Sequence, residues 1–76
     1  MTGDATLRAY VNGTPVDVPK SATVLDAVER AFPLLAAEVR SGDSVVADSR
    51  GLPIEPDTPL HGGAILRVAP VRRRES

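Results

Sequence analysis

The chain contains no cysteine and a single histidine, His61, among its 76 residues. Without thiols it cannot form disulfide bonds, thiolate zinc sites or cysteine-ligated iron–sulfur clusters, and it has no cysteine nucleophile. One histidine is too few for a histidine-based metal site, and no second acid or base lies close to His61 in the sequence. Asp48, Glu55 and Asp57 are spread over a proline-rich stretch, which favours solvated charges over metal ligands. We therefore expect no catalytic residues, no cofactor and no metal site.

Aromatic residues and long apolar runs are also scarce. Tyr10 and Phe32 are the two aromatic residues, so the core must be built from aliphatic side chains. No apolar run approaches the roughly 20 residues that span a bilayer, and residues 1–4 have neither the basic nor the apolar part of a signal peptide. We expect a cytoplasmic protein that does not enter membranes. A single domain of 76 residues buries roughly 60–65% of its unfolded surface, which leaves little room for a deep pocket.

Acidic residues outnumber basic residues outside the C-terminal end of the sequence. The formal net charge is −1, but residues 1–71 contain six basic and nine acidic side chains, whereas Arg72, Arg73 and Arg74 follow one another directly. This pattern predicts an acidic body with a short basic tail over residues 72–76, which we expect to be flexible, as are residues 1–5. Nucleic acid is not an expected partner, because its recognition favours a larger basic patch and stacking aromatic residues.

What the sequence does contain is a β-hairpin followed at once by a capped helix. Two stretches of alternating apolar and polar residues flank Asn12 and Gly13, a pair typical of a two-residue turn. The register set by this turn places the apolar strand residues on one face and Arg8 opposite Asp17 on the other. The amide position of Pro15 then points away from the partner strand, so we expect the second strand at an edge of the sheet.

A helix is predicted to begin directly after the hairpin. Thr23 is a favourable N-cap, and Asp26 at the third helical position suits the positive end of the helix dipole. Pro33 interrupts the helical periodicity and begins a short second helical turn over residues 33–39, which Gly42 ends. Apolar residues at helical spacing are expected to face inward: Val24, Leu25, Val28, Ala31, Phe32, Leu35 and Val39.

Further short strands are expected in the second half of the chain. Leu60 is expected to plug the core, and residues 61–63 form a turn before the last strand. The order of elements predicts an α+β fold of the β-grasp, or ubiquitin-like, type over residues 6–71. Such a fold has a mixed four- to five-stranded sheet packed on one helix, here with a short second helical turn. The expected strands are residues 7–11, 14–18, 44–47, 52–54 and 64–69.

Several segments, in this order, resemble the ThiS/MoaD sulfur-carrier family over nearly the whole chain. In that family a partner enzyme adenylates the carboxylate of a terminal glycine, which is then converted to a thiocarboxylate. The resemblance therefore implies an adenylating enzyme or a synthase large subunit as a partner. The segments that carry the resemblance are Val11-Asn12-Gly13, Val18-Pro19, Ala22-Thr23-Val24, Ala31-Phe32-Pro33-Leu34, Asp57-Thr58-Pro59-Leu60 and Ala69-Pro70-Val71.

One part of the sequence departs from the family pattern. The family ends in Gly-Gly directly after the segment that Ala69-Pro70-Val71 resembles, whereas Arg72 and Arg73 occupy those positions here and Ser76 ends the sequence. Two bulky cations do not suit a narrow channel that admits an extended glycine tail. Our first hypothesis is therefore a non-catalytic, ubiquitin-like protein-interaction module of the ThiS/MoaD type. A divergent sulfur carrier for molybdopterin or thiamin biosynthesis, which would need trimming or unusual activation, is the alternative.

A second alternative comes from a resemblance to TGS domains. Residues 23–27 and 57–60 are similar to these β-grasp modules, which are attached to some synthetases and GTPases and sense ligands or RNA. The resemblance implies a nucleotide- or RNA-sensing module that would use Arg72, Arg73 and Arg74. Its binding would weaken steeply with salt.

The candidate partner-binding surface is the sheet face that points away from the helix. Alternation places Arg8 and Tyr10 of the first strand and Ile65 and Arg67 of the last strand on this face. The fold implies that these strands are parallel neighbours, so the four side chains would form one patch. Tyr and Arg are favoured in interface cores, and another protein is the expected partner. An ordinary solvated sheet face is the other interpretation.

Overall fold

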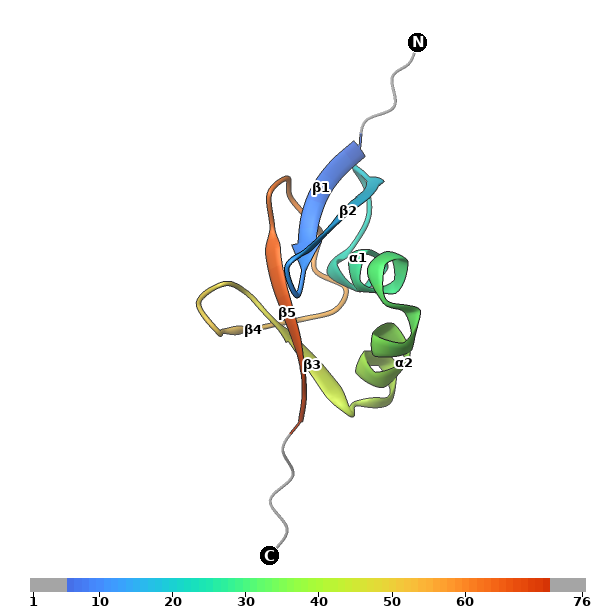
Figure 1. Cartoon of the computed structure of the whole chain (residues 1–76), viewed down its shortest axis with the longest axis vertical. Coiled ribbons are helices and arrows are strands. Elements are labelled where there is room, and N and C mark those ends of the chain that lie inside the picture. The colour runs from blue at the N-terminus through green and yellow to red at the C-terminus, as the bar shows by residue number, and fades with distance from the viewer. Residues whose placement is uncertain (1–5, 72–76) are drawn as a thin grey trace, which may run out of the picture.

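The computed structural model describes residues 6–71, which form a five-stranded mixed sheet and two helices (Figure 1). The elements are β1 (Thr6–Val11), β2 (Thr14–Pro19), α1 (Val24–Ala31), α2 (Pro33–Ser41), β3 (Ser44–Ala47), β4 (Pro53–Ile54) and β5 (Ile65–Pro70). The strand order is β2-β1-β5-β3-β4, in which β1 and β5 are parallel and the other neighbours are antiparallel. Both helices pack on the same side of the sheet. The predicted α+β class is confirmed, and the sheet has five strands, the upper end of the predicted four to five.

The β1–β2 hairpin has the register that the sequence predicts. Arg8 lies opposite Asp17 across the two strands. Asn12 and Gly13 have φ values of +51° and +85°, the left-handed conformation that a two-residue hairpin turn requires. Asn and Gly adopt this conformation at low cost, so the turn is encoded locally. As Pro15 predicted, β2 lies at an edge of the sheet.

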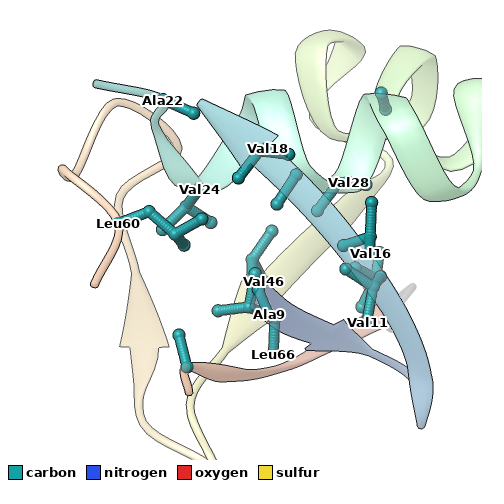
Figure 2. Packing of buried hydrophobic residues seen from close by; sticks show 14 of the residues in the cluster. Ala9, Val11, Val16, Val18, Ala22, Val24, Val28, Val46, Leu60 and Leu66 are labelled. Carbon is teal, nitrogen blue, oxygen red and sulfur yellow. The ribbon is translucent and has the colours of Figure 1, made fainter. Parts of the chain in front are cut away.

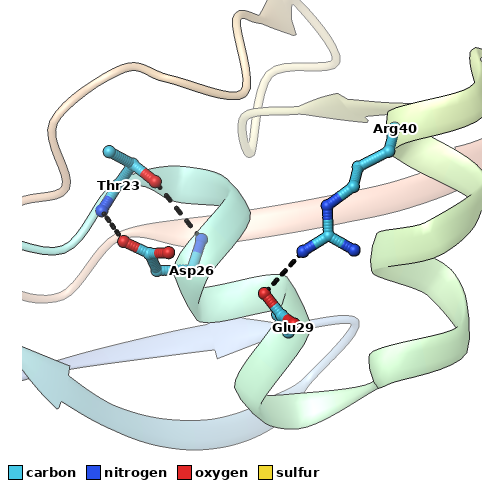
Figure 3. A network of polar contacts seen from close by, with 4 residues as sticks. All are labelled: Thr23, Asp26, Glu29 and Arg40. Atoms are coloured by element: carbon cyan, nitrogen blue, oxygen red, sulfur yellow. Dashed lines mark hydrogen bonds and ion pairs between the residues drawn. The ribbon is translucent and has the colours of Figure 1, made fainter.

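Helix α1 begins with a reciprocal capping box (Figure 3). The N–H of Asp26 donates to Thr23 Oγ1 at 3.3 Å, and the N–H of Thr23 donates to Asp26 Oδ2 at 3.0 Å. These bonds provide partners for backbone donors that a helix start leaves unpaired. The N-cap predicted at Thr23 is therefore confirmed.

Helix α2 is longer than the short turn over residues 33–39 that the sequence predicted. It has nine residues, from Pro33 to Ser41, and is followed by Gly42, whose φ of +88° allows the chain to leave the helix. Proline fits the first turn because the N–H that it lacks would have no helical acceptor there. The two additional residues include Arg40, whose Nη2 lies 2.7 Å from Glu29 Oε1 of α1 and links the two helices (Figure 3).

The core between sheet and helices is aliphatic, as the scarcity of aromatic residues predicts (Figure 2). Leu66 of the central strand is 2% exposed, and Leu60 lies in the core as expected. Ala27 and Ala36 are fully buried, although they are not among the helix residues expected to face inward. Their small side chains give a weak hydrophobic signal in the sequence, but they allow the helices to pack closely. Some residues expected to face inward are only partly buried at the margin of the core: Leu25, Ala31, Phe32 and Leu35.

The segment between β4 and β5 is fixed to the start of α1. The N–H of Val24 donates to the carbonyl of Thr58 at 2.9 Å, and the N–H of Leu60 donates to the carbonyl of Ala22 at 3.0 Å. These bonds hold Leu60 in the core. The last strand begins one residue later than predicted because the N–H of Ala64 still bonds within the turn, to the carbonyl of residue 61 at 3.2 Å.

Candidate functional site

The four predicted partner-binding residues lie on the outer face, the side of the sheet opposite the helices. Arg8, Tyr10, Ile65 and Arg67 are all exposed there, and Tyr10 and Ile65 are register partners in the parallel β1–β5 pair. Arg8 comes two residues before Tyr10, and Arg67 comes two residues after Ile65. Because parallel strands run in the same direction, the arginines lie on opposite sides of this pair, about 13 Å apart along the strands.

Arg8 is engaged by a neighbour on the outer face. Its Nε and Nη2 donate to the two carboxylate oxygens of Asp17 at 3.0 and 3.2 Å. This hydrogen bonding lowers the pKa of Asp17 below its ordinary value and raises the pKa of Arg8. Both side chains are more than half exposed, so the ion pair adds little stability. Its main effect on the outer face is to neutralise the charge of Arg8.

Arg67 has no such partner among the residues that the structure describes. The ion pairs within residues 6–71 involve Arg8, Arg40 and Arg50. Arg67 lies on β5, the middle strand of the sheet, and is paired in register with Ala47 of β3. Within the described part of the chain, an exposed guanidinium without a carboxylate partner therefore lies at the centre of the outer face.

Val45 enlarges the apolar part of the outer face, and the sequence interpretation missed it. Val45 is 46% exposed, compared with 49% for Ile65 and 36% for Tyr10. Its register partner on β5 is Ala69, so it lies beyond Arg67 as seen from Ile65. Alternation around the buried Val46 was the available signal, but the antiparallel β3–β5 pairing was needed to place it. We call the following residues the outer-face patch: Tyr10, Val45, Ile65, Arg67 and Ala69.

His61 and Asp48 lie beside the outer-face patch, because Ile65 of the patch lines the same cleft as they do. His61, Asp48 and Arg50 border an open cleft of about 290 Å³. Asp48 folds its own loop, because its carboxylate accepts the N–H of Leu52 at 3.0 Å and of Arg50 at 2.8 Å. These bonds lower its pKa, the Leu52 bond most strongly, and they keep Leu52 out of the predicted strand 52–54. Within residues 6–71, no three His, Cys, Asp or Glu side chains are grouped so as to hold a metal ion.

Arg72, Arg73 and Arg74 lie outside the described residues, as do residues 1–5. Within the described part, the N–H of Val71 donates to the carbonyl of Asp43 at 2.8 Å. The backbone is thus hydrogen-bonded, to the residue before β3, as far as the residue that precedes the three arginines.

Comparisons with known proteins do not assign a family. No protein-family model matches the chain, and no curated protein matches it. Across residues 6–71, neither helix is long and apolar enough to cross a bilayer.

Proposed function

We propose that this chain is a β-grasp, or ubiquitin-like, domain that acts as a non-catalytic module and binds another protein through the outer-face patch. The element order, the central parallel β1–β5 pair and the placement of both helices on one side of the sheet support the β-grasp assignment. The segments that resemble the ThiS/MoaD family occur in the same order. The expected cytoplasmic location stays a prediction.

The observation that supports partner binding most strongly is a cation that has no ion-pair partner within residues 6–71 and lies among exposed apolar side chains at the centre of the sheet. Single exposed hydrophobic residues are ordinary on protein surfaces. Here, however, Tyr10, Ile65 and Val45 share one face over three adjacent strands, with Arg67 between them. Tyr and Arg are favoured at the centre of interfaces. A bound protein would cover the apolar groups and give Arg67 a counter-charge.

The test uses a partner that is obtained from the native host by affinity capture, purified, and titrated by calorimetry. Ile65→Asp should weaken its binding at least about tenfold, because the substitution removes apolar contact area and puts a desolvated charge in the interface, next to Arg67, which the partner is proposed to bind. Leu34→Asp is the matched control, since Leu34 is 81% exposed on α2, away from the outer face. It should bind as the wild type does. Unchanged affinity of Ile65→Asp would contradict the proposed function.

A divergent sulfur carrier is the second candidate function. Its support is the anchoring of β5 up to Val71, directly before the position where the ThiS/MoaD family has Gly-Gly. Carrier function would require removal or unusual activation of the segment that begins with Arg72. Mass spectrometry of the protein from its native host tests this candidate. A chain that stays intact to Ser76, with no species heavier by sulfur, would contradict it.

A TGS-like nucleotide- or RNA-sensing function is the third candidate. It depends on Arg72, Arg73 and Arg74, and it predicts RNA binding that falls steeply as salt rises. A filter-binding assay at low salt decides it, because absence of RNA retention there would exclude this function.

A further inference from the structure

We propose that the partner docks on the outer-face patch as a folded protein surface, apolar and with a carboxylate for Arg67, and not as a strand added to the sheet. This inference rests on the proposed function and adds to it the mode of binding and the chemistry of the partner. Strand addition requires unpaired backbone donors at a sheet edge. In the described sheet four prolines and one side chain remove or cover most of these donors, and the N–H of Asp17 is the exception on β2.

The first edge is β2. The N–H of Tyr10 donates to the carbonyl of Ala64, next to β5, at 2.9 Å, so the backbone of Tyr10 faces away from β2. Its register partner Pro15 therefore faces away from β1, as do Asp17 and Pro19 by alternation. Two of these three outward positions are prolines, which have no N–H to donate.

Little of the β2 edge remains for an added strand. Asp17 provides the one outward N–H of β2, and the carbonyl of Pro19 already accepts the N–H of Ala22 at 2.9 Å. An added strand needs a donor and an acceptor at every second residue. The β2 edge is therefore a poor template for strand addition.

The opposite edge, β4, has only two residues, and one of them is a proline in the same orientation. The N–H of Asp48 donates to the carbonyl of Leu52 at 2.9 Å. The next pair, Ala47 and Pro53, therefore lies between hydrogen-bonded pairs, and the nitrogen of Pro53 points away from β3. This edge is closed by its short length and by Pro53.

A third stretch of edge would arise where β5 runs past the end of β1. β1 ends at Val11, opposite Leu66, whereas β5 continues to Pro70. Asn12 replaces the missing strand with its side chain: Oδ1 accepts the N–H of Val68 at 2.9 Å, and Nδ2 donates to the carbonyl of Val68 at 3.4 Å. The next backbone position on this side is Pro70, which again has no N–H.

With the edges closed to strand addition, a partner on this sheet must contact the side chains of the outer face, and Arg67 indicates the partner's chemistry. The described residues include six basic and eight acidic side chains. On the outer face, Asp17 neutralises Arg8, whereas Arg67 has no ion-pair partner within residues 6–71. A partner surface with a carboxylate opposite Arg67 would pair this cation, and apolar groups opposite Ile65 and Val45 would cover the exposed apolar side chains.

The first experiment tests whether the prolines close the β2 edge. The double variant Pro15→Thr, Pro19→Thr gains two outward N–H groups, and threonine suits strands. We expect its self-association to be on the order of tenfold tighter than that of the wild type by sedimentation equilibrium, with unchanged circular dichroism of the monomer. Pro33→Thr, at the start of α2, is the control and should behave as wild type. Equal self-association of the double variant and the wild type would overturn the inference.

The second experiment examines the complex with the purified, affinity-captured partner. We expect the N–H of Asp17 to exchange with solvent equally fast in the free and bound domain, as measured by NMR. Arg67→Glu should weaken binding on the order of tenfold, and Lys20→Glu, which reverses an exposed cation in the turn after β2, should not. Unchanged affinity of Arg67→Glu would overturn the carboxylate assignment.

The outcomes separate the inference from the proposed function on which it rests. If solvent exchange of the N–H of Asp17 slows at least about tenfold in the complex while Ile65→Asp still weakens binding, the partner has added a strand to β2. Only the inference is then overturned. If Ile65→Asp binds the partner as the wild type does, the patch is not the binding surface and both are overturned.

Discussion

Replacing Asn12 should destabilise the domain more than the exposure of this turn residue suggests. Its φ of +51° is unfavourable for most residues. Its side chain also makes two hydrogen bonds, of 2.9 and 3.4 Å, to the backbone of Val68. At this residue β5 extends past the end of β1 and has no neighbouring strand on that side. Its own N–H bonds to the carbonyl of Leu66 at 2.9 Å, and this bond survives substitution by any residue except proline.

Three substitutions at Asn12 separate these contributions. Asn12→Asp keeps an acceptor for the N–H of Val68 and should cost about 0.5–1.5 kcal/mol, the value of one lost bond. Asn12→Gly loses both bonds without steric strain and should cost about 1–3 kcal/mol. Asn12→Ala adds the strain of a left-handed alanine, about 1 kcal/mol more. The expected order of stability is wild type, Asp, Gly, Ala.

Urea and thermal unfolding followed by circular dichroism measure this series. At about 4–8 °C per kcal/mol for a domain of this size, Asn12→Ala should lower the Tm by at least about 8 °C. If Asn12→Gly were as stable as the wild type, the bonds to Val68 would contribute nothing. The argument that the Asn12 side chain closes the free stretch of β5 would then be wrong.

Three other predictions concern the core, the pH dependence and the helix start. Leu66→Ala should cost about 2–5 kcal/mol in urea unfolding, since it opens a cavity at a site that is 2% exposed; a cost below about 1 kcal/mol would contradict the packing. Because Arg8 lowers the pKa of Asp17 from 3.8, the stabilisation by the charged carboxylate is present above this value and is lost as pH falls through the lowered pKa. Stability measured from about pH 5 to pH 2 should therefore fall further for the wild type than for Asp17→Asn, and equal losses would contradict this role. Thr23→Ala should cost about 1 kcal/mol and Thr23→Ser much less; equal costs would show that the capping hydroxyl is not used.

The hairpin could be predicted from the sequence because its determinants are local. Asn12-Gly13 fixes the turn, alternation fixes the faces, and Pro15 indicates the edge. The capped start of α1 at Thr23 is equally local. Each of these features depends on residues within a few positions of one another, so tertiary structure does not need to be known.

Other features depend on side-chain bonds or strand pairings that the sequence pattern did not indicate. The Asp48 carboxylate binds the N–H of Leu52 and so removes Leu52 from the expected strand. Val45 joins the outer-face patch through the pairing of β3 with β5, strands far apart in the sequence. The closure of β5 by the Asn12 side chain spans 56 residues. Alternation along a single strand contains no information about such contacts.

The most direct measurement is a heteronuclear NMR titration of the isotope-labelled wild-type domain with the purified, affinity-captured partner. If the partner binds the outer-face patch, the largest shift changes fall on β1, β5 and β3, including Tyr10, Ile65, Arg67 and the methyl groups of Val45. The signals of α1 and α2, including Leu34, should change little. Shift changes concentrated on the helices, with an unperturbed β5, would contradict binding through the outer face.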